Sequence, residues 1–211
     1  MTLPEIIREV QAELKKTQPS LAVDGKAGPQ TWGAIYDRIV GGAGTGALPA
    51  PGIQVDDTPV DARSEKNIAT LHPRVQPLAR SLILRAMERG WNFKITSALR
   101  TYAEQDALYA QDRTKPGKRV TNARGGYSNH NFGLAFDVTL FNGSQPVWDS
   151  PLYKALAVIG QELGLEWGGN WKSPVDEPHY QLRPAWAAGM KESVMLTELR
   201  RRKAAVRDFY A

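Results

Sequence analysis

Residues 128–141 read SNHNFGLAFDVTLF, and the order of apolar and polar residues in this stretch decides the fold around it. The second half alternates, which places Phe136, Val138 and Leu140 on one face of an extended strand and Asp137 on the other face. We therefore expect a half-buried strand whose Asp137 points away from the core.

His130 precedes Asp137 by an odd number of positions, so a continuous strand would place the two side chains on opposite faces. Gly133 lies between them, and glycine tolerates the backbone conformations that a sharp bend requires. The sequence therefore predicts a bend at Gly133 that brings His130 to the side of Asp137.

A second segment, DEPHY at residues 176–180, pairs another histidine with carboxylates. Zn²⁺ is held by neutral imidazole and carboxylate groups, and a catalytic zinc site uses three protein ligands and leaves one position for water. Taken singly, each residue has an ordinary interpretation as a loop histidine or a strand-edge carboxylate. Together, His130, Asp137 and His179 form a complete set of zinc ligands.

The pattern S-x-H-x-x-G-x-A-x-D followed by D-x-P-H resembles the zinc D-Ala-D-Ala carboxypeptidase and L-alanyl-D-glutamate endopeptidase superfamily, peptidase family M15. The endopeptidase branch, found in phage endolysins and some bacterial autolysins, is the more similar one. Three further segments resemble the family, and the resemblance spans about residues 66 to 184. They are LHP at 71–73, ITSALRTYAEQ at 95–105 and WGGNW at 167–171.

The resemblance implies that His130, Asp137 and His179 bind zinc and that Asp176, three residues before the last histidine, is the catalytic carboxylate. Strand parity favours Glu177 instead, because it would share a face with His179. Pro178 weakens this objection, since proline is found mainly where a strand starts or lies at an edge. We select Asp176 as the general base and keep Glu177 as the alternative.

Three polar residues complete the expected site. The resemblance implies that Arg100 contacts the substrate, and its planar guanidinium suits a developing oxyanion, so we expect a catalytic role. Gln105 and Ser128 are candidate substrate-binding residues. The alternatives are that Arg100 is a surface residue at a helix start, that Gln105 faces solvent and that Ser128 caps a turn.

The first forty residues form a separate expected unit. Pro4 suits the first turn of a helix, and a second helix is expected from Thr31. Residues 23–32, VDGKAGPQTW, resemble a helical peptidoglycan-binding domain, although the segment is shorter than that family's three-helix unit. The alternative is a helical hairpin that packs on the catalytic domain.

We expect three parts: a peptidoglycan-binding-like helical domain at 1–40, a flexible Gly- and Pro-rich linker at 41–65, and a zinc peptidase domain at 66–211. The fold class of the peptidase domain is α+β, a small antiparallel sheet with helices packed on one side, beside a small all-α N-terminal domain. The elements expected are helices at 75–89, 101–111 and 151–163, strands at 93–99, 135–141 and 179–182, and a loop bordering the cleft at 114–126.

The net charge of +5 favours anionic partners, and no nucleic-acid recognition motif is present. The run Arg200-Arg201-Arg202-Lys203 is expected in a solvated C-terminal helix, with contact between that helix and an anionic envelope as the alternative. We expect a monomer. No secretory signal is visible, so we expect a cytoplasmic protein that reaches the wall on release, through a holin if it is viral.

The leading hypothesis is a zinc endopeptidase that cleaves the L-Ala–D-Glu bond of the peptidoglycan stem peptide, as in a phage or prophage endolysin. A second is a D-Ala-D-Ala carboxypeptidase, disfavoured because that branch usually carries Glu-x-x-His-Trp where this chain has residues 176–180. A third is a non-catalytic wall-binding protein.

Overall fold

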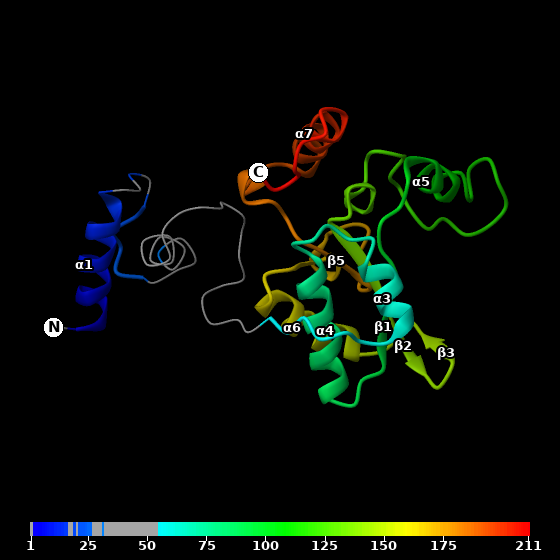
Figure 1. Cartoon of the computed structure of the whole chain (residues 1–211), viewed down its shortest axis with the longest axis horizontal. Coiled ribbons are helices and arrows are strands. Elements are labelled where there is room, and N and C mark those ends of the chain that lie inside the picture. Colours follow the sequence, from blue (N-terminus) through cyan, green and yellow to red (C-terminus); the bar gives the residue numbers. More distant parts are fainter. Residues whose placement is uncertain (1, 17–18, 20, 27–30, 32–54) are drawn as a thin grey trace. The chain divides into compact units, whose positions relative to one another are not determined.

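The computed structural model describes residues 2–16, 19, 21–26, 31 and 55–211. The chain divides into two compact units, Met1–Ile53 and Gln54–Ala211 (Figure 1). Among the described residues, no helix combines the length and the apolar character that crossing a membrane requires.

The N-terminal unit contains helix α1 (Leu3–Lys15), with Pro4 in its first turn. Gln11 is buried, and its side-chain amide donates to Asp24 Oδ1 at 2.9 Å and to Thr31 Oγ1 at 2.9 Å. This amide therefore ties the helix to the loop that follows it. Apart from Thr31, the second helix expected here lies outside the described residues.

The range predicted for the linker, 41–65, extends too far at its C-terminal end. Residues 41–54 of that range lie outside the described residues. Helix α3 (Ala62–Ile68) begins inside the expected range, because the Asp61 side chain accepts hydrogen bonds from two backbone N–H groups of its first turn. Upstream, the Asp56 N–H donates to Ser81 Oγ at 2.7 Å. This second contact joins the segment to α4 of the C-terminal unit.

A five-stranded sheet forms the centre of the C-terminal unit. Its strands are antiparallel in the order β1-β2-β5-β4, and β3 pairs with β2 off this path. The strands are β1 (Phe93–Ser97), β2 (Ala135–Asn142), β3 (Gln145–Val147), β4 (Glu166–Trp167) and β5 (His179–Gln181).

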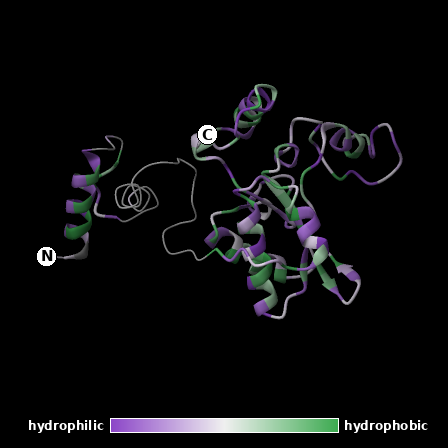
Figure 2. Cartoon of the chain, viewed as in Figure 1, coloured by the Kyte–Doolittle hydropathy of each residue, from purple (hydrophilic) through white to green (hydrophobic). Residues whose placement is uncertain are grey.

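Helices α4 (Gln76–Glu88) and α6 (Leu152–Glu162) contact each other and pack beside the sheet, where apolar segments are concentrated (Figure 2). On the face that α6 covers, the Phe136 ring stacks on Tyr180, whose ring lies so close to Gly160 that a Cβ there would be 2.5 Å from it. The opposite face of β2 and β5 carries Asp137 and His179. One face of the sheet therefore packs against α6, and the other face presents the side chains of Asp137 and His179.

The remaining helices are α5 (Tyr102–Tyr109) and α7 (Glu192–Ala204), with single 3₁₀ turns η1 (Asn129–Phe132), η2 (Gly168–Asn170) and η3 (Ala185–Ala187). Thr101 caps α5 in a capping box with Glu104, as the sequence predicts. The α+β class is confirmed, and the expected elements end one or two residues sooner than predicted, except β2, which continues one residue further, to Asn142. The short strands β3 and β4 were not predicted.

Candidate metal centre and its cleft

Three separate elements bring the predicted ligands together. His130 lies in η1, Asp137 in β2 and His179 in β5. Asp137 and His179 are direct cross-strand partners, which places their side chains on the same face of the sheet. Gly133 ends η1 with φ of 68°, the left-handed conformation that glycine adopts readily, and so makes the predicted bend.

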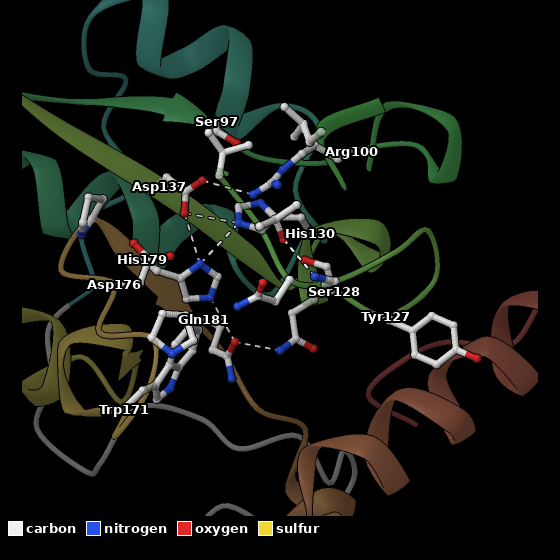
Figure 3. Close-up of a pocket in the computed structure, with 18 of the residues that line it drawn as sticks. Ser97, Arg100, Tyr127, Ser128, His130, Asp137, Trp171, Asp176, His179 and Gln181 are labelled. Carbon is white, nitrogen blue, oxygen red and sulfur yellow. Dashed lines mark hydrogen bonds and ion pairs between the residues drawn. The ribbon is translucent and has the colours of Figure 1, made fainter. Parts of the chain in front are cut away.

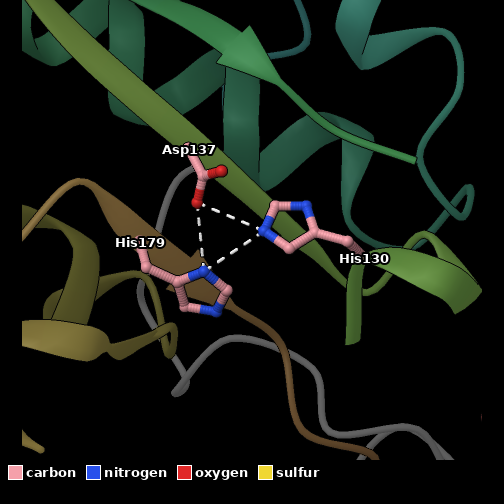
Figure 4. A group of neighbouring side chains, drawn as sticks. All are labelled: His130, Asp137 and His179. Atoms are coloured by element: carbon pink, nitrogen blue, oxygen red, sulfur yellow. Dashed lines mark hydrogen bonds and ion pairs between the residues drawn. The ribbon is translucent and has the colours of Figure 1, made fainter. Parts of the chain in front are cut away.

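The ligand atoms converge (Figure 4). His130 Nε2 lies 3.2 Å from Asp137 Oδ1 and 3.3 Å from His179 Nδ1, and the latter two atoms are 3.1 Å apart. A tetrahedral zinc ion with bonds of about 2.0–2.1 Å separates its ligand atoms by about 3.3–3.4 Å. The three distances therefore fit one tetrahedral zinc ion with little movement.

The protonation of His130 supports a cation at this point. Its Nδ1 lies 2.7 Å from the Ala98 carbonyl oxygen, which can only accept, so Nδ1 carries the proton in the neutral ring. Nε2 then presents a lone pair toward the Asp137 carboxylate. Because such groups repel when they are buried together, the arrangement favours a bound cation.

Burial and charge shift the pKa values of these groups. Burial lowers the pKa of His130. Burial alone would raise the pKa of Asp137, but the two histidines hold it well below its usual value. Asp137 is therefore ionised, and His130 is neutral, which are the forms that bind a metal. His179 differs, because burial is outweighed by its contacts with Asp137, which raise its pKa, so a bound metal would have to displace a proton from this ring.

Arg100 approaches Asp137 from the other side: its Nη2 donates to Asp137 Oδ2 at 3.1 Å, whereas Oδ1 faces the histidines. Its Nη1 donates to Gln105 Oε1 at 3.0 Å. Burial lowers the pKa of Arg100, opposed by Asp137. Gln105 is fully buried and also donates to Thr121 Oγ1, so its amide holds Arg100 and a loop and does not face solvent.

The two candidate carboxylates, Asp176 and Glu177, differ in their position relative to the cleft. Asp176 lines the cleft, and burial, together with the charge of Asp137, raises its pKa. Glu177 does not line it, and its carboxylate lies 3.9 Å from Lys154 Nζ on α6. A turn in which the His179 N–H donates to the Asp176 carbonyl at 3.2 Å precedes β5, so the parity of a regular strand does not apply here.

The triad opens into a cleft of about 1250 Å³ (Figure 3). Ser128, just before η1, lines it, as does residue range 120–124 of the predicted bordering loop. Aromatic side chains border the cleft: Tyr127 and Trp148 are more than half exposed, whereas Trp171 lies 4.8 Å from the His179 ring. The cleft is large enough for an extended peptide segment.

The basic run near the C-terminus lies in α7 and makes several internal contacts. Arg200 donates to the Gly126 carbonyl at 2.9 Å, and Lys203 donates to the Asn131 carbonyl at 2.9 Å. Arg201 and Arg202 pair with Glu198. The contacts of Arg200 and Lys203 attach α7 to the segment that carries His130, whereas the pairs with Glu198 lie within the helix.

The sequence interpretation omitted a group of polar residues behind His179. Its Nε2 lies 3.0 Å from Gln181 Oε1, and Gln181 is itself bonded to Asn129 and Glu166. Strand parity contained a signal for Gln181, since residues two apart share a face. Nothing comparable marked Asn129 or Glu166.

Comparisons with known proteins agree with this geometry. Residues 121–182 match a family described as D-alanyl-D-alanine carboxypeptidase. The chain is 40% identical over 124 residues to the peptidoglycan L-alanyl-D-glutamate endopeptidase CwlK of Bacillus subtilis, covering 54% of this chain and 74% of that protein. The chain belongs to peptidase family M15.

The chain is also similar to a phage protein and to a solved structure. An L-alanyl-D-glutamate peptidase of Listeria phage A118 is 29% identical over 123 residues, which cover 57% of this chain and 41% of that protein. The crystal structure of the Serratia marcescens L-Ala D-Glu endopeptidase ChiX has 28% identity and a TM-score of 0.42, covering 62% of this chain and 93% of that one. Zinc is the metal of the M15 family, and the triad suits it.

Proposed function

We propose that this M15 peptidase is a peptidoglycan hydrolase that cleaves the L-Ala–D-Glu bond of the stem peptide. The convergence of His130, Asp137 and His179 on one point, at tetrahedral spacing, carries the proposal of a zinc site. The activities of the Bacillus and Listeria phage relatives support the choice of bond.

Each residue has a distinct part in this proposal. The triad would hold zinc, which would act as a Lewis acid and make a nearby water easier to deprotonate. Asp176 takes a proton from the attacking water and delivers it to the leaving amine, because it is the carboxylate that lines the cleft beside the triad. Arg100 holds Asp137 through Oδ2 and offers positive charge to the growing oxyanion.

Ser128 and Gln105 differ in their access to the cleft, and we assign their roles from that difference. Ser128 lines the cleft and forms no side-chain cap with η1, so its hydroxyl is available to a bound peptide. Gln105 acts indirectly, through its hydrogen bonds to Arg100 and to the loop at Thr121. We therefore assign Gln105 the role of orienting Arg100. The sequence had predicted a direct contact between Gln105 and the substrate.

Digestion of purified peptidoglycan followed by mass spectrometry tests this function. We expect fragments with a new N-terminal D-Glu, their loss when a chelator removes zinc, and their return when zinc is restored. Intact stem peptides under all conditions would contradict it.

A D-Ala-D-Ala carboxypeptidase is the second candidate, because the family that matches residues 121–182 carries that description. The segment 176–180 lacks the Glu-x-x-His-Trp pattern usual in that branch. In the same digestion, release of free D-Ala without a new D-Glu terminus would identify this activity.

Wall binding, oligomeric state and location of the protein also enter the proposal. We propose that the N-terminal unit binds peptidoglycan, that the protein is a monomer, and that it stays in the cytoplasm until release to the wall, through a holin if it is viral. The internal contacts of α7 favour a structural role for that helix over contact with an anionic envelope. Sedimentation of each unit with insoluble peptidoglycan tests the first part.

A further inference from the structure

A closed ring of polar side chains lies behind His179. Gln181 is almost fully buried on β5 and shares a face with His179. Its Oε1 lies 3.0 Å from His179 Nε2 and accepts a hydrogen bond from Asn129 Nδ2 at 2.7 Å. Its Nε2 donates to Glu166 Oε2 at 2.6 Å.

Three charged residues close the ring. Arg183 donates through Nε to Glu166 Oε1 at 2.5 Å and through Nη2 to Glu192 Oε2 at 2.6 Å. Asn129 Nδ2 donates to Glu192 Oε1 at 2.5 Å. The ring thus joins β4, β5, η1 and the first turn of α7 around a single metal-facing histidine.

The donors and acceptors of the ring leave the Gln181 amide one orientation. Glu166 is a carboxylate that only accepts, so it requires the NH₂ group of Gln181. Asn129 presents its NH₂ group, so it requires the oxygen of Gln181. The oxygen therefore also faces His179 Nε2, which must donate to it, and this leaves the lone pair of the neutral ring on Nδ1, the atom that faces Asp137 and His130.

We propose that Gln181 is a positioning residue for the zinc site, and that the ring of Glu166, Arg183, Glu192 and Asn129 fixes the amide of Gln181 so that His179 binds the metal through Nδ1. The inference rests on the proposed zinc site and adds residues with no direct contact to zinc or substrate. Partners of this kind around a metal-binding histidine typically change metal affinity 10- to 100-fold when they are removed.

Two substitutions at one position separate positioning from stability. Gln181→Met has a similar size but no acceptor for His179 Nε2–H, so we expect zinc affinity to fall about 10- to 100-fold. Gln181→Glu keeps an acceptor but loses the donor to Glu166 and adds a like charge beside it. We expect its zinc affinity to stay within a few-fold of wild type while its zinc-free melting temperature falls below that of Gln181→Met.

Gln76→Met is the matched control. The Gln76 side chain donates to the Leu71 carbonyl at 2.9 Å and lies on α4, away from the triad. The same change of side chain should leave zinc affinity unchanged there. All four proteins are compared as full-length chains by competition with a chromophoric zinc chelator.

A spectroscopic signature completes the test. In the zinc-loaded wild type, the ring N–H protons of His130 (Nδ1) and His179 (Nε2) should both be protected from exchange by their hydrogen bonds. Gln181→Met should lose the His179 signal and keep that of His130, whereas Gln181→Glu should keep both.

The outcomes are distinguishable. Gln181→Met binding zinc within twofold of wild type would overturn the positioning role, and so would equal losses of affinity in both Gln181 variants. Absence of zinc binding by the wild-type chain would instead overturn the proposed metal site, and the inference with it.

Discussion

The two histidines of the metal centre are oriented in different ways. The Nδ1 of His130 contacts the main-chain carbonyl of Ala98, and its Nε2 faces the site. His179 uses the opposite atoms: Nε2 contacts the side chain of Gln181, and Nδ1 faces the site. One ligand is therefore set by backbone geometry and the other by a network of side chains.

This difference predicts where the centre tolerates mutation. A backbone carbonyl remains whatever side chain its residue carries, so the support of His130 is removed only if the backbone just after β1 moves. The support of His179 depends on the identity of several side chains, each of which one substitution can change. The half of the site built on β5 should accordingly be the more sensitive to substitution.

Removing either ligand should have the largest effect and erase the difference between the two halves. His130→Ala and His179→Ala each leave two of three protein ligands, so we expect loss of zinc binding and of peptidoglycan cleavage in both. Zinc content and release of soluble fragments measure this. Wild-type turnover in either variant would remove that histidine from the ligand set.

Replacing the proposed general base should lower the rate of the reaction and leave zinc binding intact. Asp176→Asn should lower kcat by about 10²- to 10⁴-fold, the usual contribution of general acid–base catalysis, with zinc affinity retained. Glu177→Gln is the matched control, because its carboxylate faces Lys154 outside the cleft, and it should keep near-wild-type kcat. A reversed result would make Glu177 the base.

Ala98→Gly tests the backbone-supported histidine. The substitution keeps the carbonyl that orients His130, so zinc affinity should stay within about twofold of wild type, although the added backbone freedom costs about 1 kcal/mol of unfolding free energy. Chelator competition and thermal unfolding measure the two quantities. A loss of affinity as large as that expected for Gln181→Met would remove the contrast between the two histidines.

A distant ion pair should show the smallest effect and provide a stability control. The side-chain hydrogen bonds from Arg80 lower the pKa of Glu65 below its ordinary value of 4.5. Its contribution to stability is therefore present above about pH 4.5 and is lost as pH falls through the lower folded-state pKa. Glu65→Gln should lower the free energy of unfolding by about 1 kcal/mol at pH 7, and this difference from wild type should shrink at low pH.

Zinc affinity should not change in Glu65→Gln. A weaker zinc site in this variant would show that loss of stability alone loosens the metal, and would undermine the interpretation of every Gln181 variant.

The sequence predicted the parts of the site that depend on local pattern. Alternation in 135–141 placed Asp137 on the open face, and Gly133 predicted the bend that brings His130 to it. The capping box at Thr101 located the start of α5. These features follow from strand periodicity, glycine conformation and helix capping, all of which act between near neighbours.

What the sequence did not reveal depends on residues far apart in the chain. No local pattern marks Glu166, Arg183 or Glu192 as part of the site. They come together only because the fold places β4, β5 and α7 side by side. Gln105 became a support for Arg100 because the loop at Thr121 folds over it. The proposed choice of Asp176 over Glu177 as the base likewise rests on a turn before β5 that strand parity does not describe.

A crystal structure of the zinc-loaded chain, with anomalous data at the zinc edge, would locate the metal and identify its ligand atoms. We expect one zinc ion bound to His130 through Nε2, to His179 through Nδ1 and to one Asp137 oxygen, with Gln181 Oε1 still bonded to His179 Nε2. Zinc bound through Nε2 of His179, or at a site that lacks any of these three residues, would contradict it.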